Sequence, residues 1–513
     1  MNFIDKFLNK ITMYRVVLYS LTILTVIAII LNISNVLLPD TSSLHFISGL
    51  LILLASCFLS NLLFSKIFKA PTNLESSYIT AYLLFFILAP VTSYNGLWMF
   101  VVVGVLAMAS KYILAINRKH IFNPVAIALV IVGVFGSGIA IWWVATPSML
   151  VPTLVLGLFV LRKVRKFTLF FSFLVPAIVT IFIFGIINGQ PLTSMIMPIL
   201  VSWPIIFFAT FMLTEPQTTP PQGTMQIYYG VLVGILFGAQ FHFGTVYSTP
   251  ELALVFGNIF SYTVSPKLKL FLRLEEKKLV ADNTYEFSFS RIDGKPIGLK
   301  FSPGQYLEWT MEDSKPDTRG NRRFFTIASS PTEETIKLGI RTTTVNPSSF
   351  KKLLVAMEKG GRLVATGLAG EFTLPRDPKH KLVFIAGGIG VTPFRSMAQY
   401  LLDTRESRDI VHLYSNKVSS DVAYKNIFDS AKEVGIKTVY ALTDLQSVPA
   451  DFVGAGEVGF INKDMILKHV PDFLERTFYI SGPHGMVIVF ERMLEDMGVL
   501  KSNIRSDFFP GFA

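Results

Sequence analysis

The chain has 513 residues, enough for several domains, but only 16 % of them are charged, against about 25 % in an ordinary soluble protein. The charge is unevenly distributed, because residues 1–266 hold 17 charged residues, about 6 %, and residues 267–513 hold 64, about 26 %. This asymmetry excludes a wholly soluble protein and equally a protein made only of membrane helices. The sequence predicts a membrane half joined to a soluble half.

The net charge of +11 does not indicate a nucleic-acid partner. The 12 Lys and Arg residues of the first half lie in short loops between apolar segments, and no basic stretch of the second half is interleaved with aromatic residues. The single cysteine, Cys57, excludes an internal disulfide, a CxxC zinc site and a four-cysteine iron–sulfur cluster, so we expect no metal site. No small-residue cleavage site follows the first apolar run, which we therefore expect to remain as an anchor.

Ten apolar runs are candidates for membrane-spanning helices, which need about 20 residues each. If all ten cross the bilayer, the 12 basic residues fall on one side, and the positive-inside rule places both termini and the soluble half in the cytoplasm. The sequence thus predicts a multi-pass protein of the cell membrane, although the third, fourth and sixth runs are short. The runs are 16–38, 46–64, 77–91, 97–110, 124–144, 149–161, 167–187, 194–213, 226–243 and 250–265.

Two segments on the predicted cytoplasmic side hold polar residues at the ends of apolar runs. KYILAINRKHIFNP (residues 111–124) ends in Asn123, which fits a helix N-cap before a proline. In FMLTEPQTTPP (residues 211–221), Glu215 lies close to Thr218 and Thr219. Glu215 is either a solvated helix-end residue or part of a site, since ionisable groups at membrane depth tend to line sites.

Together and in this order, these segments resemble the membrane flavin subunits of two bacterial respiratory complexes, the sodium-pumping NADH:quinone reductase and the Rnf complex. That family commonly carries FMN on a threonine in a Ser/Thr-Gly-Ala-Thr motif, which the nearest counterpart here, NGQPLTSM (residues 188–195), lacks. The resemblance therefore implies a non-covalent FMN or riboflavin on the cytoplasmic side, near Asn123, Glu215, Thr218 and Thr219.

The soluble half begins with short alternating runs, which predict the strands of an antiparallel β-barrel over residues 267–378. From residue 379 onward, strand patterns alternate with helical patterns, which predicts a parallel, doubly wound α/β domain over residues 379–513. The predicted fold is a polytopic α-helical membrane domain of about ten transmembrane helices (residues 1–266) fused to these two domains. The predicted barrel strands are KLKLFLRLEEK, YEFSFSRI, QYLEWTME, RFFTIASS and ETIKLGIRTT.

A glycine-rich turn, AGGIGVTP (residues 386–393), joins the first strand of the α/β domain to its first helix. Gly387, Gly388 and Gly390 would let backbone N–H groups approach a phosphate at the helix N-terminus, although close packing alone also requires glycine at such turns. A second turn, YISGPHGM (residues 479–486), follows another strand at the edge where parallel sheets bind ligands.

Four motifs now occur in the order of the ferredoxin–NADP reductase family. RFFTIASS, preceded by PGQY, resembles its FAD signature, and NPSSFKKLL resembles its second flavin-phosphate contact, with Asn346 at the usual glycine position. AGGIGVTPFRSM and YISGPHGM resemble the dinucleotide turn and the Cys-Gly-Pro segment, with Ser481 for the cysteine. The end of the chain, SDFFPGFA, resembles the acidic-aromatic tail, with Asp507 for the usual glutamate.

The resemblance covers nearly all of residues 270–513 and implies an oxidoreductase that binds FAD in the barrel and NAD(P)H in the α/β domain. It implies that Arg323 and Ser349 bind the FAD pyrophosphate. Phe325, rather than Phe324, would face the isoalloxazine ring, and Thr326 would bond to its reacting edge. Ser481 would lie near the hydride transfer, which makes Phe325, Thr326 and Ser481 the catalytic candidates. The other implied cofactor-binding residues are Gln305, Gly387, Gly388, Gly390, Thr392, Gly482, Pro483 and two aromatics that would cover the flavin, Phe509 and Phe512.

The choice of nicotinamide rests on SNKVSS, which follows the second strand of the α/β domain. Ser415 and Lys417 would receive a 2′-phosphate, and no acidic residue is placed to bind a ribose diol, so the sequence favours NADPH over NADH. A lysine in a loop is, however, commonly only solvated.

We expect electrons to pass from cytoplasmic NAD(P)H through FAD to the membrane flavin, and on to quinone, another acceptor or a partner redox protein. One alternative is a haem-containing reductase of the ferric reductase or NADPH oxidase type, which would need paired histidines on facing helices. A second alternative is a transporter with a redox-sensing flavin domain, which buried acids in the membrane half would favour. The relevant side chains are His45, His120 and His242 for the first alternative and Glu75, Glu215 and Glu251 for the second.

Overall fold

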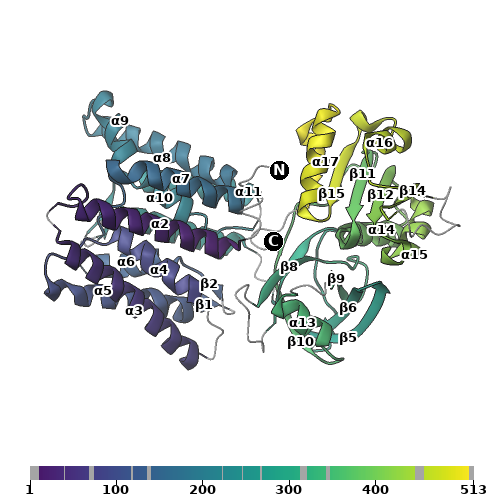
Figure 1. Ribbon diagram of the computed structural model, residues 1–513, viewed down its shortest axis with the longest axis horizontal. Coiled ribbons are helices and arrows are strands. Elements are labelled where there is room, and N and C mark those ends of the chain that lie inside the picture. The colour runs from purple at the N-terminus through teal and green to yellow at the C-terminus, as the bar shows by residue number, and fades with distance from the viewer. Residues whose placement is uncertain are drawn as a thin grey trace. The chain divides into compact units, whose positions relative to one another are not determined.

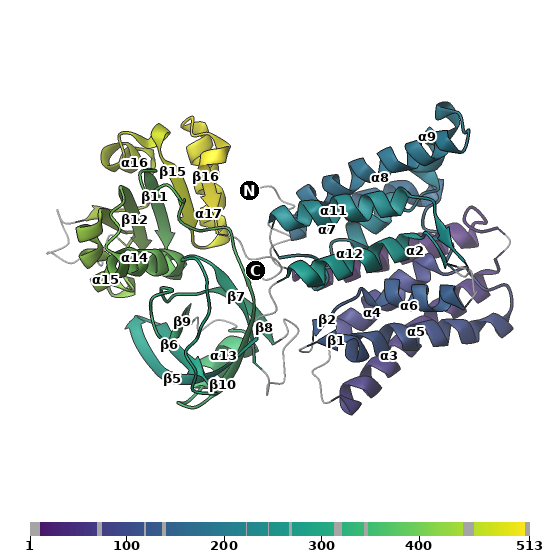
Figure 2. The same cartoon turned by 180° about the vertical axis from the view of Figure 1, so that it is seen from behind.

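The chain folds into two compact units, one formed by residues 4–265 and the other by residues 266–512 (Figures 1 and 2). We describe them from a computed structural model. The residues that the structure describes are 11–39, 41–68, 74–116, 119–135, 140–221, 223–244, 246–265, 269–311, 321–342, 347–444 and 456–507.

The first unit is helical, and every predicted apolar run contains a helix. Five helical segments among the described residues are long and apolar enough to cross a membrane: Met13–Ile33, Ser43–Ile67, Tyr94–Ile113, Pro147–Val164 and Phe167–Ile187. The expectation of about ten full spans therefore holds for five segments, and the other helices are shorter. The helices are α2 (Met13–Ile33), α3 (Ser43–Ile67), α4 (Leu74–Ile87), α5 (Leu97–Ile113), α6 (Pro124–Val134), α7 (Pro147–Val164), α8 (Phe167–Ile187), α9 (Leu192–Val201), α10 (Ile205–Phe207), α11 (Gly223–Gly238) and α12 (Pro250–Val264).

The helical unit can be divided into two parts, α2 to α6 and α7 to α12, each of which contains a pair of packed helices followed by a hairpin and a last helix. In the first half α3 packs along α5, and in the second half α8 packs along α11. In each half a two-stranded hairpin then precedes a last helix that begins with a proline. The hairpins are β1 (Ala115–Ile116) with β2 (Lys119–His120), and β3 (His242–Phe243) with β4 (Val246–Tyr247).

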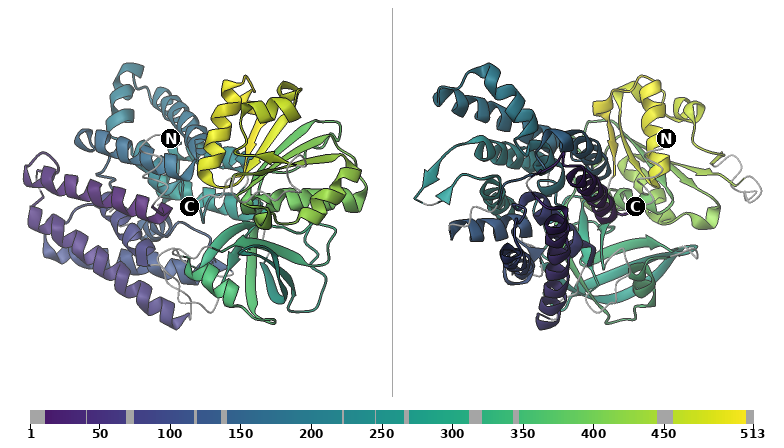
Figure 3. Two further views of the ribbon diagram at one scale, coloured as in Figure 1. Left: turned by 45° about the vertical axis from the view of Figure 1, so that its right-hand side comes forward. Right: turned by 60° about the vertical axis from the view of Figure 1, so that its left-hand side comes forward.

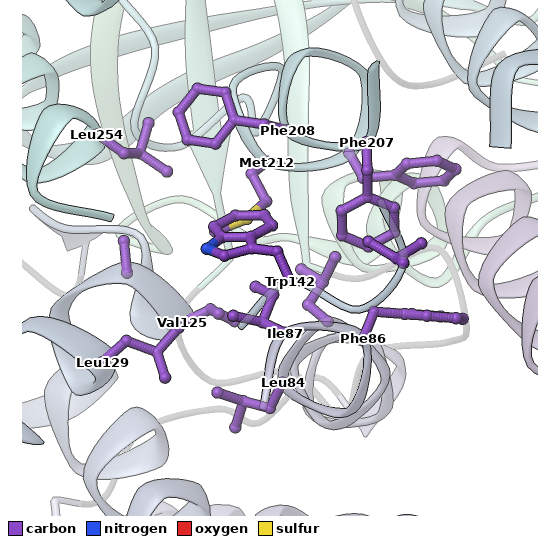
Figure 4. Close-up of a cluster of buried hydrophobic side chains, with 14 of the residues drawn as sticks. Leu84, Phe86, Ile87, Val125, Leu129, Trp142, Phe207, Phe208, Met212 and Leu254 are labelled. Carbon is purple, nitrogen blue, oxygen red and sulfur yellow. The ribbon is translucent and has the colours of Figure 1, made fainter. Parts of the chain in front are cut away.

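The run 124–144 was predicted as one helix, but α6 ends at Val134. Beyond it the chain pairs with the end of α4, since the N–H groups of Ile141 and Trp142 both donate to the carbonyl oxygen of Ile87 at 2.9 Å. Trp142 has a φ of 52°, which is rare for a bulky residue. Its indole lies among apolar side chains of several helices (Figure 4), and its Nε1 donates to Glu251 Oε1 at 2.7 Å.

The second unit contains a six-stranded antiparallel sheet that curls around its own core (Figure 3). Its strand order is β8-β7-β10-β5-β6-β9, so β8 and β9 are the two edge strands. Among the described residues no hydrogen-bonded ladder joins these edges, so the predicted barrel is a curled, open sheet. Phe350 and Leu354 of helix α13 (Ser349–Ala356) fill the core. The strands are β5 (Lys269–Ala281), β6 (Thr284–Arg291), β7 (Tyr306–Thr310), β8 (Arg322–Thr326), β9 (Ile336–Arg341) and β10 (Arg362–Ala369).

The same unit contains a six-stranded sheet in the order β14-β13-β12-β11-β15-β16, and all of its strand pairs are parallel. Helices α14 (Thr392–Thr404) and α15 (Lys425–Ser430) pack on one face, and α16 (Lys463–His469) and α17 (His484–Asp496) pack on the other. The strand order reverses between β11 and β15, so their carboxyl ends flank the crevice where such sheets bind ligands. The strands are β11 (Leu382–Gly387), β12 (Ile410–Asn416), β13 (Ile436–Leu442), β14 (Glu457–Val458), β15 (Thr477–Ser481) and β16 (Ile504–Ser506).

Candidate functional site

Three side chains from three strand ends meet where the two sheets of the second unit come together. Thr326 ends β8 of the curled sheet, Ser481 ends β15 of the parallel sheet, and Asp507 follows β16. The hydroxyls of Ser481 and Thr326 donate to the same carboxylate oxygen, Asp507 Oδ2, at 3.2 Å and 3.5 Å. The backbone N–H of Asp507 donates to the carbonyl oxygen of Ile480 at 2.9 Å, which fixes the carboxylate in place.

The charge of this carboxylate changes near neutral pH. Burial raises the pKa of Asp507 to about 7, although the hydrogen bonds from Ser481 and Thr326 act in the opposite direction. A carboxyl group that titrates at this pH beside two hydroxyls is typical of a functional site. The sequence pointed to Thr326 and Ser481 and showed Asp507 only as part of a tail motif.

The predicted glycine turn lies directly beside this cluster. Gly387 ends β11, and Gly388 and Gly390 form a short 3-10 turn before Thr392, the first residue of α14. Gly388 has a φ of 51°, and a Cβ on Gly390 would lie 2.5 Å from the carbonyl oxygen of Ser481. Packing against the 481–482 backbone therefore requires glycine at position 390, and the turn lies directly against Ser481, Gly482 and Pro483.

Arg341 is a candidate binding residue that the sequence interpretation missed. It ends β9 of the curled sheet, and its Nη1 lies 3.5 Å from the position that a Cβ of Gly388 would occupy. Its Nη2 bonds to Asp421 Oδ1 at 2.8 Å, which holds the guanidinium beside the glycine turn. A guanidinium beside the backbone of a glycine turn suits a pyrophosphate. Only the tertiary structure brings this strand end to the turn.

The residues predicted to hold the FAD pyrophosphate lie together at one edge of the curled sheet. Arg323 is buried, with its guanidinium carbon 5.9 Å from the ring centre of Phe350, and Phe350 follows Ser349 at the start of α13. Serine also caps this helix, because Ser348 Oγ accepts a hydrogen bond from the backbone N–H of Lys351 at 3.3 Å. A buried guanidinium beside serine hydroxyls and a helix N-terminus fits the chemistry of a pyrophosphate.

The two phenylalanines of the flavin motif are both half-buried, on opposite sides of β8. Phe325 lies 5.7 Å, ring to ring, from Phe350, and Phe324 lies 5.6 Å from Tyr306. The choice of Phe325 for the isoalloxazine face therefore stays a prediction. Gln305 has a structural role: its amide accepts from the N–H of residue 302 at 2.9 Å and donates to the carbonyl oxygen of residue 370 at 3.2 Å.

The residues predicted to bind a 2′-phosphate lie at the end of β12, the strand next to β11. Ser415 of β12 is the register partner of Gly387, which places it next to the turn, and Lys417 is exposed just beyond the strand. The predicted tail residues Phe509 and Phe512 lie outside the described residues.

In the helical unit, the structure brings together all four residues predicted for a membrane flavin. Asn123 Nδ2 donates to Glu215 Oε2 at 2.9 Å, and Thr218 Oγ1 donates to the same oxygen at 3.2 Å. The hydroxyl of Thr219 donates to the carbonyl oxygen of Glu215. His120 Nε2 lies 3.0 Å from Glu215 Oε1. Glu215 is therefore bound by neighbouring side chains and is not a solvated helix-end residue.

Further buried polar groups from distant helices extend this cluster, and the sequence interpretation missed them. Lys166 Nζ donates to Thr219 Oγ1 at 2.6 Å, and the backbone N–H of Asn123 donates to Asn258 Oδ1 at 2.7 Å. A π-helical turn, Phe208–Met212, ends just before Glu215, and such turns occur frequently at functional sites. Because these groups already bond to one another, a flavin bound here would have to displace part of the network.

The side chains required by the two alternative functions are engaged elsewhere. His45 packs edge-on against Tyr94 at 4.5 Å, His120 contacts Glu215, and His242 lies on strand β3, so these histidines do not form the pair on facing helices that a haem needs. Of the acids, Glu75 bonds to a neighbouring arginine at 3.0 Å, and Glu251 accepts from a buried indole.

Comparisons with known proteins agree with the geometry of the second unit. Residues 384–491 match the family model described as an oxidoreductase NAD-binding domain. The C-terminal region is a ferredoxin–NADP reductase-like FAD- and NAD-binding domain. We call it the reductase region, and its homologues are NAD(P)H-dependent FAD oxidoreductases.

The relatives include a flavohemoprotein of Pseudomonas putida, 26 % identical over 239 residues, which cover 46 % of this chain and 58 % of that protein. A glycine betaine monooxygenase reductase subunit of Pseudomonas aeruginosa is 27 % identical over 225 residues, 43 % of this chain and 60 % of that protein. A solved structure, the flavohem-like FAD/NAD-binding domain of nitric oxide dioxygenase from Vibrio cholerae, is 18 % identical, with a TM-score of 0.41, and covers 47 % of this chain and 98 % of that one. The chain thus spans about 60 % of the length of the curated relatives it matches.

Proposed function

We propose that the chain is a membrane-bound flavoprotein oxidoreductase that passes electrons from NAD(P)H through FAD into its helical half. There they would reach a non-covalently bound FMN or riboflavin and then quinone, another acceptor or a partner redox protein. The observation that carries this proposal is the meeting of Thr326, Ser481 and Asp507 beside the glycine turn, at the edge where the flavin-binding and dinucleotide-binding sheets join.

FAD, when bound, would supply the chemistry, because a flavin accepts hydride and releases electrons singly. Arg323 and Ser349 would bind its pyrophosphate at the start of α13, and Phe325 would support the ring. Thr326 would direct its hydroxyl to the reacting edge of the ring. Asp507 accepts hydrogen bonds from Thr326 and Ser481, so it holds both hydroxyls in one orientation.

NAD(P)H would bind along the glycine turn, with its pyrophosphate between the backbone of residues 387–390 and the guanidinium of Arg341. Ser481 and Gly482, opposite Gly390, would then border the nicotinamide. Ser415, beside the turn, and the exposed Lys417 support NADPH as the donor.

The helical half would place this chemistry at a bilayer. Five helical segments have the length and composition of membrane spans, and the basic residues favour a multi-pass topology with cytoplasmic termini. The cluster around Glu215 supports a site at the predicted cytoplasmic side of the helical half. A relative named as a reductase subunit of a monooxygenase supports a partner protein as an alternative acceptor.

Flavin extraction tests the proposal. Acid release from the full-length protein in detergent should yield one FAD and one further flavin per chain, with no flavin left on the denatured polypeptide. Anaerobic NAD(P)H should bleach the flavin absorbance, and a water-soluble quinone should restore it. One FAD alone would refute the second flavin, and an unbleached flavin would refute the oxidoreductase.

A further inference from the structure

A buried arginine links the helix that follows the glycine turn to the segment just beyond strand β8, where the flavin motif ends. Arg395 lies in α14, three residues after Thr392, and is only 3 % exposed. Its Nη1 donates to the carbonyl oxygen of Ala328, two residues beyond Thr326, at 3.0 Å. It also binds both carboxylate oxygens of Glu333, with Nη2 3.0 Å from Oε1.

Neighbouring groups reinforce the same connection. Ser396 Oγ donates to the carbonyl oxygen of Ser329 at 2.7 Å. Lys337 Nζ lies 2.8 Å from Glu333 Oε1, and Glu286 Oε2 lies 3.8 Å from Arg395 Nε. Arg395 and Ser396, in the first turns of α14, thus bond to residues 328–333, which follow strand β8.

The ion pair is fully charged in the pH range of an enzyme assay. Burial opposes the ionisation of Glu333, but the hydrogen bonds and positive charge of Arg395 outweigh it and hold the pKa of Glu333 below its ordinary value. A bidentate pair of this kind has a defined geometry, unlike an exposed lysine contact.

We propose that Arg395 is a positioning residue for hydride transfer, acting through Glu333 and Ala328 to set the distance between the glycine turn and the flavin motif. The inference rests on the proposed function, because it presumes that nicotinamide and flavin react in this crevice. The glycine turn immediately precedes α14, and Thr326 is separated from Ala328 by one residue, so Arg395 connects segments that directly adjoin both binding elements. A misplacement of about 1 Å between reacting groups costs about 10²-fold in rate.

The chain contains a matched control. Arg476 is also buried and also forms a bidentate ion pair, with Nη1 and Nη2 at 2.8 Å and 3.0 Å from the carboxylate oxygens of Asp409. It lies at the opposite end of the parallel sheet, where its Nη1 donates to the carbonyl oxygen of Leu382, the first residue of β11, at 3.3 Å. Arg476→Lys therefore weakens the bidentate ion pair of another buried arginine, whose partner Asp409 is exposed, without touching the link to the flavin motif.

The experiment compares Arg395→Lys, Glu333→Gln and Arg476→Lys in the full-length protein with its FAD. Anaerobic stopped-flow reduction by NAD(P)H gives the limiting rate of flavin bleaching and the apparent Kd of the nucleotide. We expect the rate to fall about 10- to 100-fold in Arg395→Lys and in Glu333→Gln, with Kd changed less than about threefold. The deuterium isotope effect with C4-deuterated nucleotide should rise. Arg476→Lys should lower the thermal midpoint but keep the rate within about twofold.

Three outcomes would overturn the proposal. In the first, Arg395→Lys and Arg476→Lys lose the same thermal stability and bleach the flavin at the same rate. In the second, Arg395→Lys changes the Kd of the nucleotide but not the bleaching rate. If Arg395→Lys loses its FAD, the nearly isosteric Glu333→Gln carries the test, and a wild-type rate in it also refutes the role. A wild-type protein that does not reduce its FAD with NAD(P)H would instead refute the proposed function itself.

Discussion

Replacing Gly390 by alanine is a direct test of the geometry at the crevice. The added Cβ would lie 2.5 Å from the carbonyl oxygen of Ser481 and 2.6 Å from the N and Cα atoms of Gly482. All of these are backbone atoms, which cannot rotate away as a flexible side chain can. Ordinary contact begins near 3.4 Å, so the glycine turn and the end of β15 must separate by about 0.9 Å.

The size of the effect follows from this displacement. The turn and the end of β15 carry the two sides of the proposed nicotinamide site, so a shift of about 0.9 Å misaligns the donor with the flavin. Misplacement on this scale costs about 10²-fold in rate, or about 2.7 kcal/mol of transition-state stabilisation. Overpacking also destabilises the fold by about 1–3 kcal/mol, which a thermal scan measures separately.

The assay is anaerobic flavin bleaching at saturating NAD(P)H, and the matched control is Gly485→Ala. Gly485 lies in the first turn of α17, three residues after Gly482, and its added Cβ would meet no atom within 4 Å. We expect the control to keep the wild-type rate while Gly390→Ala loses about two orders of magnitude. A Gly390→Ala protein that reduces its FAD at the wild-type rate would show that the nicotinamide does not bind between this turn and Ser481.

Four further predictions follow from single residues. Burial raises the pKa of Asp507 to about 7, so its neutral form stabilises the folded protein at low pH, and that stabilisation is lost as the pH rises through 7. The rate of flavin bleaching should therefore change near pH 7, and Asp507→Asn should abolish this change. Arg341→Gln should raise the KM for NAD(P)H about tenfold with a smaller change in kcat, and an unchanged KM would exclude a pyrophosphate contact. Burial lowers the pKa of His412 to about 3, whereas the unfolded side chain titrates near 6.5, so the folded protein should lose stability as the pH drops below 6.5. Thermal scans between pH 7 and pH 5 should show that the free energy of unfolding falls by about 2 kcal/mol, and His412→Phe should remove this loss. Glu215→Ala should lower the thermal midpoint in detergent, because it leaves the hydrogen-bonding partners of a half-buried carboxylate unpaired, and it should release the second flavin while FAD stays bound. Full retention of both flavins would separate this cluster from flavin binding.

The features that sequence alone predicted are those with a local physical cause. The alternation of apolar and polar residues along β6 and β9 predicted both strands, and their apolar residues Phe287, Phe289, Leu338 and Ile340 lie in the core of the curled sheet. The turn at Gly387–Gly390 was recognised because strand, glycines and helix follow one another along the chain. By contrast, the length of α6 was overestimated, because its C-terminal boundary depends on pairing with Ile87 of another helix.

The same division applies to the site residues. Asn123, Glu215, Thr218 and Thr219 were predicted together because two short motifs contain them, and hydrogen bonds in the structure join them. Lys166 was missed, because a lysine between two apolar runs has the pattern of a topology-setting charge, and only the packing of its helix directs the amine to Thr219.

By itself, the amino-acid sequence determined the partition of the chain into a charge-poor and a charge-rich half, the strands and helices of the second half, and the order of its binding motifs. These depend on composition, periodicity and turn chemistry, which act over a few residues. Only the tertiary structure decided that Arg341 reaches the glycine turn, that Arg395 binds Ala328 just beyond the flavin strand, and that Asp507 joins Thr326 to Ser481. Such contacts join residues far apart in the chain, and a charged side chain in a strand or helix carries no local sign of whether it meets water or a buried partner.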